Sequence, residues 1–276
     1  YVHALREAPV QGAVFTTACD QMRRAAEMAA RDCPYPVFLM LVPATWQTAS
    51  AHRLYASELE RLGAFLCGLG GERPSNVRLA EMMDAYDAAR RRLRDARPWM
   101  PARSFAEALR ECQINPNASL PAGPGIPIHR SDKPVAVVGP ELPERFWNLY
   151  DIIEAQGGRV VLDATGNGER TWPAPFDRRA LRDDPFGELA GAYFGGIPDA
   201  FRRPNTLLYQ WLQREFTSRG VRGVVFIRRL WCDTWAVEEA RLREWTALPV
   251  VAVDADDEGV TPRTATRLES FLEALR

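Results

Sequence analysis

The chain has 276 residues, 46% of them hydrophobic, and its 35 basic and 36 acidic side chains leave a formal net charge of −1. This balance excludes the strong electrostatic footprint of a nucleic-acid-binding protein or of one held on an anionic membrane. No apolar run approaches the ~20 residues of a membrane span, and the N-terminus lacks the basic start and apolar stretch of a signal peptide, so we expect a cytoplasmic protein with no nucleic-acid or membrane partner.

The first half of the chain predicts a β-α-β unit followed by two long helices. The apolar run at 12–17 is typical of a strand, the segment 20–30 of a helix, and the run at 36–42 of a second strand. Helical spacing then predicts helices over 48–70 and 74–97, the second opened by its proline, a residue favoured in the first turn.

A stretch rich in proline and glycine separates this half from the rest. Residues 115–134 show little periodicity, which is typical of a linker. Because the length of the chain favours two cores, we predict an N-terminal α/β domain at 1–118 with a long helical segment, a linker at 119–133 and a C-terminal α/β domain at 134–276.

The second half alternates strands and helices in the manner of a doubly wound fold. Strands are predicted at 134–139, 159–163, 221–228 and 249–254. Apolar residues spaced for one face of a helix follow the first of them, at Phe146, Leu149, Tyr150 and Ile153. This alternation predicts an α/β fold with largely parallel sheets and right-handed crossovers.

One motif occurs in both halves and is the most informative feature of the sequence. GAVFTTACD at 12–20 and GVVFIRRLWCD at 223–233 are both apolar strands that end in Cys-Asp. In each case a proline lies 17 positions after the cysteine, at Pro36 and Pro249, and a valine and a new strand follow it. Two such units predict two similar domains, each with a cysteine at the carboxyl end of a strand.

That location favours ligand chemistry for Cys19 and Cys232. Open α/β sheets bind ligands beyond the carboxyl ends of their strands, and the N-terminus of the next helix favours a thiolate, the form that binds metal. The alternative for each is a small buried hydrophobe. Five cysteines without a CxxC pair predict reduced thiols. Cys33 is expected at the far end of its helix, Cys67 in the core, and Cys112 before the linker, from where it could reach the site.

Six stretches, spread along most of the chain, carry a resemblance to a known family. They are TTACDQMRR at 16–24, VGPELP at 138–143, GGRVVLDATGNGER at 157–170, RPNTLLYQWLQ at 203–213, VRGVVFIRRLWCDTW at 221–235 and RTATRLESFLEAL at 263–275. Together they are more specific than any single short motif. The chain thereby resembles the 2-hydroxyacyl-CoA dehydratase and benzoyl-CoA reductase family, in particular the D-component of 2-hydroxyglutaryl-CoA dehydratase.

The resemblance implies two flavodoxin-like (Rossmann-like) domains with a cleft between them and a [4Fe–4S] cluster held by three cysteines of the subunit. Cys19 and Cys232 match two of these ligands. The third ligand of the family follows an Asp-x-Thr turn, which the sequence matches at 163–165, and Gly166 occupies its position. Since glycine supplies no ligand, the third one comes from a partner subunit, or no cluster is bound.

The resemblance further implies a subunit of an enzyme that acts on an acyl-CoA thioester by low-potential electron transfer. Its partners would be a homologous second subunit (a heterodimer) or a second copy (a homodimer), and an ATP-dependent activator protein. The strand-end loops 16–20, 139–141 and 165–170 would line the cleft. Gly166 supports the alternative, a cluster-free structural or accessory subunit of such a complex. A generic nucleotide-binding α/β protein would leave the Cys-Asp repeat unexplained.

Three other features have two interpretations each. Gly166 and Gly168 could let a phosphate approach the backbone, although a plain turn suits the incomplete motif better. The five arginines of 90–97 could contact the phosphates of coenzyme A or form a solvated helix face. Asp20 and Asp233 could transfer protons or cap their helices. No two of the three histidines have the spacing of a metal site.

Overall fold

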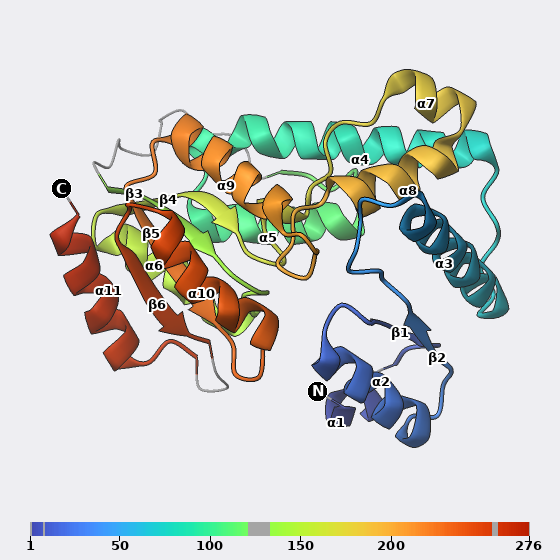
Figure 1. Cartoon of the computed structure of the whole chain (residues 1–276), viewed down its shortest axis with the longest axis horizontal. Coiled ribbons are helices and arrows are strands. Elements are labelled where there is room, and N and C mark those ends of the chain that lie inside the picture. The colour runs from blue at the N-terminus through green and yellow to red at the C-terminus, as the bar shows by residue number, and fades with distance from the viewer. Residues whose placement is uncertain (1, 8, 121–132, 256–258, 276) are drawn as a thin grey trace. The chain divides into compact units, whose positions relative to one another are not determined.

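The computed structural model describes residues 2–7, 9–120, 133–255 and 259–275 (Figure 1). Its helices and strands are α1 (Val2–Glu7), β1 (Ala13–Thr16), α2 (Asp20–Asp32), β2 (Val37–Met40), α3 (Ala49–Gly68), α4 (Asn76–Ala96), η1 (Arg97–Trp99), α5 (Ala102–Ile114), β3 (Lys133–Val138), η2 (Glu144–Phe146), α6 (Asn148–Ala155), β4 (Gly158–Ala164), η3 (Glu169–Thr171), α7 (Arg178–Asp183), α8 (Pro185–Gly196), α9 (Thr206–Arg219), β5 (Gly223–Arg228), α10 (Asp233–Trp245), β6 (Val250–Asp254) and α11 (Pro262–Ala274). None of these helices is long and apolar enough to cross a membrane.

The backbone packs into two compact units, which are described one at a time. The first comprises Tyr1–Met83, Pro173–Ile197 and Phe201–Asn205, and the second comprises Asp84–Trp172, Pro198–Ala200 and Thr206–Arg276. Residues 121–132, which make up most of the predicted linker, lie outside the described residues. The domain boundaries at 118 and 134 stay a prediction.

The first unit contains the β-α-β arrangement predicted at its start. β1 and β2 form a two-stranded parallel sheet in which Ala13 lies opposite Val37, and α2 connects them. Every second residue of β2 is buried, which is expected of a sheet with one covered face. Phe15 of β1 packs there with Ala26 and Ala29 of α2. Small alanines on the inner face of the helix bring it close to the sheet.

A cluster of aromatic rings holds α3 and α8 together in the same unit. The ring of Phe194 is 1% exposed and stacks on the ring of Tyr55 at 4.7 Å. The guanidinium of Arg202 lies 4.5 Å from the centre of the Phe194 ring, and His52 meets that ring edge-on at 4.9 Å. These contacts use His52 in packing.

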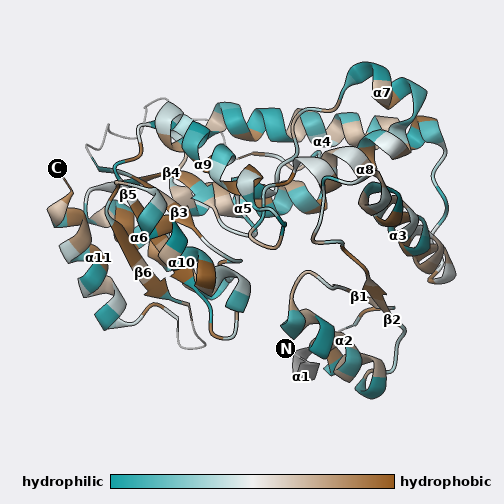
Figure 2. Ribbon diagram, viewed as in Figure 1, coloured by the Kyte–Doolittle hydropathy of each residue, from teal (hydrophilic) through white to brown (hydrophobic). Residues whose placement is uncertain are grey.

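The second unit is built on a four-stranded parallel sheet with the order β4-β3-β5-β6. Each of the four strands predicted in the second half is present within about two residues of its predicted bounds, a usual scatter at element ends. Figure 2 shows the hydrophobic colour concentrated on these strands, whereas the helices around them carry both hydrophobic and hydrophilic colours. The parallel α/β architecture is therefore confirmed.

Helices cover both faces of this sheet, and successive side chains of β3 pack alternately against the two layers of helices. Val135 and Val137 pack against α6 and α11, in a core that includes Tyr150. Ala136 and Val138 pack on the other face, against α9 and α10. Successive side chains of a strand point to opposite faces, so a strand buried on both faces needs a continuous apolar run.

Four α-helices have no counterpart among the predicted elements, namely α1, α5, α7 and α8. α8 has the sequence PFGELAGAYFGG, whose glycines weaken the helical signal, and it starts where the Asp184 side chain accepts a hydrogen bond from Gly187 N. The second of the two long predicted helices is present as α4, and its start lies within two residues of the predicted one. α4 begins at Asn76, because the Ser75 hydroxyl accepts a hydrogen bond from Arg78 N, and Pro74 lies before the helix.

Candidate functional site

Two loops at the carboxyl ends of β3 and β4 are tied together in the second unit. The side-chain amide of Asn167 accepts a hydrogen bond from Leu142 N at 3.0 Å and donates one to Leu142 O at 2.9 Å. It thus pairs with the backbone as a neighbouring strand would. Within the β4 loop, Gly168 N donates to Thr165 O at 3.2 Å, so the plain turn predicted for 166–168 is confirmed.

Asp163 lies under this loop, near the end of β4, and is 5% exposed. Its Oδ2 accepts a hydrogen bond from the Tyr150 hydroxyl at 2.6 Å, and its Oδ1 accepts two from Thr165, from N at 3.0 Å and from Oγ1 at 2.7 Å. Burial raises the pKa of the Asp163 carboxyl, and these hydrogen bonds oppose the rise. Burial also raises the pKa of the Tyr150 hydroxyl well above its ordinary value, which keeps this group a donor.

A buried ion cluster with arginines of η1 and α9 supports the same loop. Glu169 is 5% exposed and lies 2.7 Å from Arg219 Nη1 and 3.5 Å from Arg97 Nε. Both arginines also donate to backbone carbonyls of β4. Arg90 is 6% exposed and pairs with Asp87 at 2.6 Å. Arg90 and Arg97 of the predicted arginine run are therefore engaged in ion pairs, whereas Arg91, Arg92 and Arg94 are exposed, as the predicted solvated face requires.

Arg170 joins the loops to the rest of the second unit and is the largest fully buried side chain among the described residues. It donates to Ala164 O at 3.1 Å and to Pro198 O at 2.9 Å, and it forms an ion pair with Asp199. Its guanidinium carbon lies 4.8 Å from the ring centre of Trp235, which belongs to α10. One cation thus fixes the end of β4, the segment 198–199 and the first turn of α10.

Cys19 and Cys232 occupy equivalent places in the two units. Each is the N-cap residue of a 13-residue helix, α2 or α10, and neither side chain caps its helix. Asp20 and Asp233 are the first helical residues, so the capping role predicted for them is wrong. Each cysteine thus lies at the N-terminus of its helix, beside the positive end of the helix dipole.

The other three cysteines differ in their surroundings. Cys33 is the C-cap residue of α2, at the far end of the helix from Cys19 as predicted. Cys67 is exposed on α3, so its predicted place in the core is wrong. Cys112 is 3% exposed in a core with Leu109, and burial raises the pKa of its thiol. It is therefore unsuited to reach a metal site.

The position that the family resemblance gives to a third ligand is closely packed. A Cβ on Gly166 would lie 2.8 Å from Glu141 N and 2.9 Å from Glu141 Cγ. The nearest of these atoms belongs to the backbone, so a side chain at 166 requires the loop 139–141 to move. No three His, Cys, Asp or Glu side chains among the described residues form a group that could hold a metal ion. The residues present do not fit a cluster held by three thiolates of this chain.

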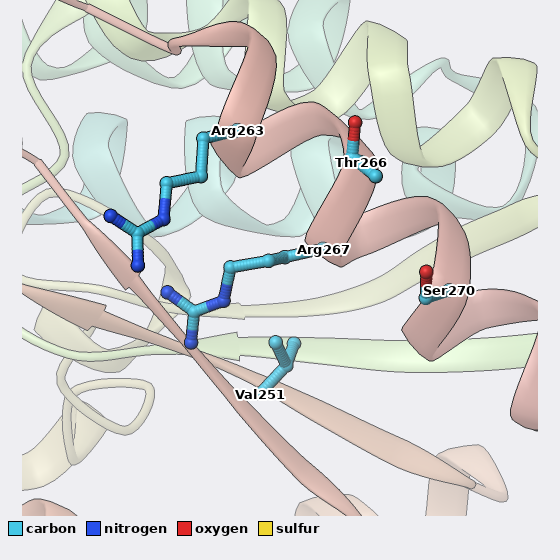
Figure 3. A pocket seen from close by; sticks show the side chains of 5 residues that line it. All are labelled: Val251, Arg263, Thr266, Arg267 and Ser270. Carbon is cyan, nitrogen blue, oxygen red and sulfur yellow. The ribbon is translucent and has the colours of Figure 1, made fainter.

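Two hollows of different size lie in the second unit. One, of about 60 Å³, is lined by Asp163 and Asn167 together with residues of α5 and the η2 region. It suits a water molecule, because pockets for coenzymes or similar ligands have ~300–1,000 Å³. The other, of about 420 Å³, is open and lies between β6, at the edge of the sheet, and α11. Figure 3 shows Arg263 and Arg267 reaching from α11 over this strand.

The residues that hold the strand-end loops in place differ from the candidates that the sequence pattern indicates. The pattern indicates the glycines of 163–170, whereas Asn167, Glu169 and Arg170 form the contacts described above. A signal is present in the sequence, because eight polar or small residues directly follow an apolar strand. A charged Glu-Arg pair after a glycine turn is nevertheless more typical of an exposed loop.

Comparison with known proteins identifies one family. The sequence model of the family described as 2-hydroxyglutaryl-CoA dehydratase, D-component, matches residues 2–275. The match includes both Cys-Asp motifs and the loops at the ends of β3 and β4. No curated protein matches the chain significantly.

Proposed function

Because the chain belongs to the 2-hydroxyglutaryl-CoA dehydratase D-component family, we propose that it is a component of a 2-hydroxyacyl-CoA dehydratase-type complex and takes part in handling an acyl-CoA thioester. The observation that supports this most strongly is the family match from residue 2 to residue 275. Its partner is a homologous second subunit or a second copy of the chain. An ATP-dependent activator protein belongs to the same proposal.

The fold supports a ligand site at the strand ends. Numbered within the second unit, the strand order β4-β3-β5-β6 is 2-1-3-4, which is how a flavodoxin-like sheet begins. Such sheets bind ligands beyond the carboxyl ends of their strands, where the chain reverses its direction across the sheet. We therefore propose a flavodoxin-like domain here, with the loops 139–141 and 165–170 facing the substrate.

The packing of Gly166 favours a component without a cluster of its own. The family is associated with iron–sulfur clusters, yet this position has neither a sulfur nor space for one. The side chains of Asn167, Glu169 and Arg170 instead hold the loops rigid, and a rigid site loses less entropy when a substrate binds. In this form the chain positions substrate or partner, and the partner subunit supplies the redox chemistry.

A second candidate keeps the cluster and the low-potential electron transfer of a dehydratase or a benzoyl-CoA reductase. It is supported by the equivalent places of Cys19 and Cys232, each at a helix N-terminus. In this form a partner subunit provides the missing ligand. Cys19 and Cys232 would then contribute thiolates, with no further ligand from this chain.

Anaerobic purification of the chain, alone and co-expressed with a homologous subunit, tests both forms. We expect a stable complex that binds coenzyme A thioesters, with no stoichiometric iron or sulfide in this chain alone or contributed by it to the complex. Iron in the complex that is lost on Cys19→Ala or Cys232→Ala, but not on Cys67→Ala, would favour the second candidate. A chain that neither associates with a homologous subunit nor binds a coenzyme A thioester would refute the proposal.

A further inference from the structure

The loop between β5 and α10 presents two large apolar side chains to solvent. Leu230 is 74% exposed and Trp231 is 70% exposed. They are adjacent in sequence and lie directly before Cys232, at the carboxyl end of a central strand. Exposing an indole costs free energy that burial would recover, so a tryptophan in this place needs a reason other than folding.

The backbone of this loop has an unusual conformation at Trp231. Trp231 has a φ of 65°, and it is the only non-glycine residue with a positive φ in the described ranges. A bulky residue rarely adopts this conformation, which occurs mostly where function requires it. The turn is closed by a hydrogen bond from Cys232 N to Arg229 O at 3.1 Å. Just before it, Arg228 forms two hydrogen bonds of 2.7 Å with Asp254.

The equivalent loop of the first unit lacks the pair. Cys19 lies seven positions after Gly12, whereas Cys232 lies nine positions after Gly223. Both loops lead into a 13-residue helix with a cysteine N-cap. The two additional residues are therefore not needed to start the helix, and they lengthen the loop at the end of β5.

We propose that Trp231 is a stacking platform for the adenine ring of a coenzyme A thioester. The inference rests on the proposed function and adds a subsite to it. A flat aromatic ring exposed to solvent suits a purine, which stacks on indole whatever its orientation in the plane. Arg229 lies two positions before Trp231 in the same loop and makes no ion pair with any described residue, so its positive charge suits the phosphates of the same ligand.

Calorimetric titration of the full chain with three probes tests this assignment. The probes are coenzyme A, adenosine 3′,5′-bisphosphate and pantetheine, so that the adenine half and the thiol half are separated. We expect Trp231→Ala to weaken the binding of adenosine 3′,5′-bisphosphate and of coenzyme A by about tenfold, which is typical of a lost aromatic–base stack, and to leave pantetheine unaffected. Trp231→Phe should lose less, because a smaller ring remains.

Two further variants separate binding from folding. Trp231→Gly removes the ring and also the cost of a positive φ, so its melting temperature should not fall while its affinity for adenosine 3′,5′-bisphosphate does. Trp99→Ala is the matched control, because it removes another exposed tryptophan, 39% exposed, outside this loop. It should bind all three probes as the parent does.

The assignment is overturned if Trp231→Ala binds adenosine 3′,5′-bisphosphate as tightly as the parent protein. It is also overturned if the substitution changes only the mass of the assembly in solution, since Trp231 would then be a protein contact. In both cases binding of coenzyme A by the parent still stands, so the proposed function survives. A parent protein that binds neither coenzyme A nor adenosine 3′,5′-bisphosphate refutes both.

Discussion

Gly166 is the position at which a single substitution tests the packing of the strand-end loops. The Cβ of Gly166→Ala would lie 2.8 Å from Glu141 N, roughly 0.6 Å closer than an ordinary van der Waals contact begins. The loop 139–141 must therefore move, and it is tied to the β4 loop by the two hydrogen bonds between Asn167 and Leu142.

The expected cost follows from these contacts. Forcing an additional carbon into a well-packed place costs about 1–3 kcal/mol. A hydrogen bond that is strained by the movement can lose up to its net contribution to stability, about 0.5–1.5 kcal/mol. We expect Gly166→Ala to lower the free energy of unfolding by about 1–3 kcal/mol. Gly63→Ala is the matched control, because its Cβ meets nothing within 4 Å and it lies inside α3, where alanine is favoured by about 1 kcal/mol.

Urea denaturation followed by circular dichroism measures both variants. The same experiment extends to Gly166→Cys, which supplies the sulfur that the family resemblance places there. We expect this variant to be destabilised like Gly166→Ala and to bind no iron after anaerobic reconstitution with iron and sulfide. The packing argument would be refuted by a Gly166→Ala protein as stable as its parent, or by a Gly166→Cys protein that takes up a stoichiometric cluster.

Two other substitutions test groups that no single sequence motif identifies. Arg170→Met leaves a carboxylate and several carbonyls without their donor, so we expect urea denaturation to show a loss of about 3–5 kcal/mol in the free energy of unfolding. The control Arg263→Met, at an exposed position, should change this free energy by less than about 0.5 kcal/mol. Equal effects of the two substitutions would contradict the buried role of Arg170. Hydrogen bonds from Arg31 and then Arg6 lower the pKa of Asp32 from 3.8 to about 2. A lowered pKa stabilises the fold at a pH above 3.8, and this stabilisation is lost as the pH falls to about 2. Asp32→Asn should therefore flatten the dependence of the melting temperature on pH in that window. Parallel curves for the variant and its parent would contradict the ion pair.

The local sequence pattern predicted all the strands but only some of the helices. Short apolar runs bounded by proline or glycine have few alternatives, and the six predicted strands are all present. α5 escaped prediction although Phe105, Leu109 and Cys112 line one face of it, because it lies just before the Pro/Gly-rich stretch. α8 escaped because its helical stability comes from packing, in particular from Phe194, and its glycines oppose it.

The site was predictable in outline but not in its contacts. The Cys-Asp repeat predicted that both cysteines lie where a strand gives way to a helix, since that depends on residues close in sequence. The order of the four strands and the contact of the segment 198–199 with Arg170 depend on residues far apart in sequence, which the pattern of a single sequence does not reveal. The close packing at Gly166 also depends on a residue far away in sequence, because Glu141 lies against it from another loop.

The pairing of Asn167 with Leu142 also bears on the chemical ageing of the protein. Asn167 is followed by Gly168, and an Asn-Gly bond deamidates when the glycine nitrogen attacks the side-chain amide. In the folded chain that nitrogen is engaged with Thr165 and the amide with Leu142, so the attack is hindered. Each unfolding event releases the restraint. The aspartate produced would lack the donor for Leu142 O and would add a negative charge beside Asp163. Deamidation in the unfolded state would therefore lower the stability of the protein once it has refolded.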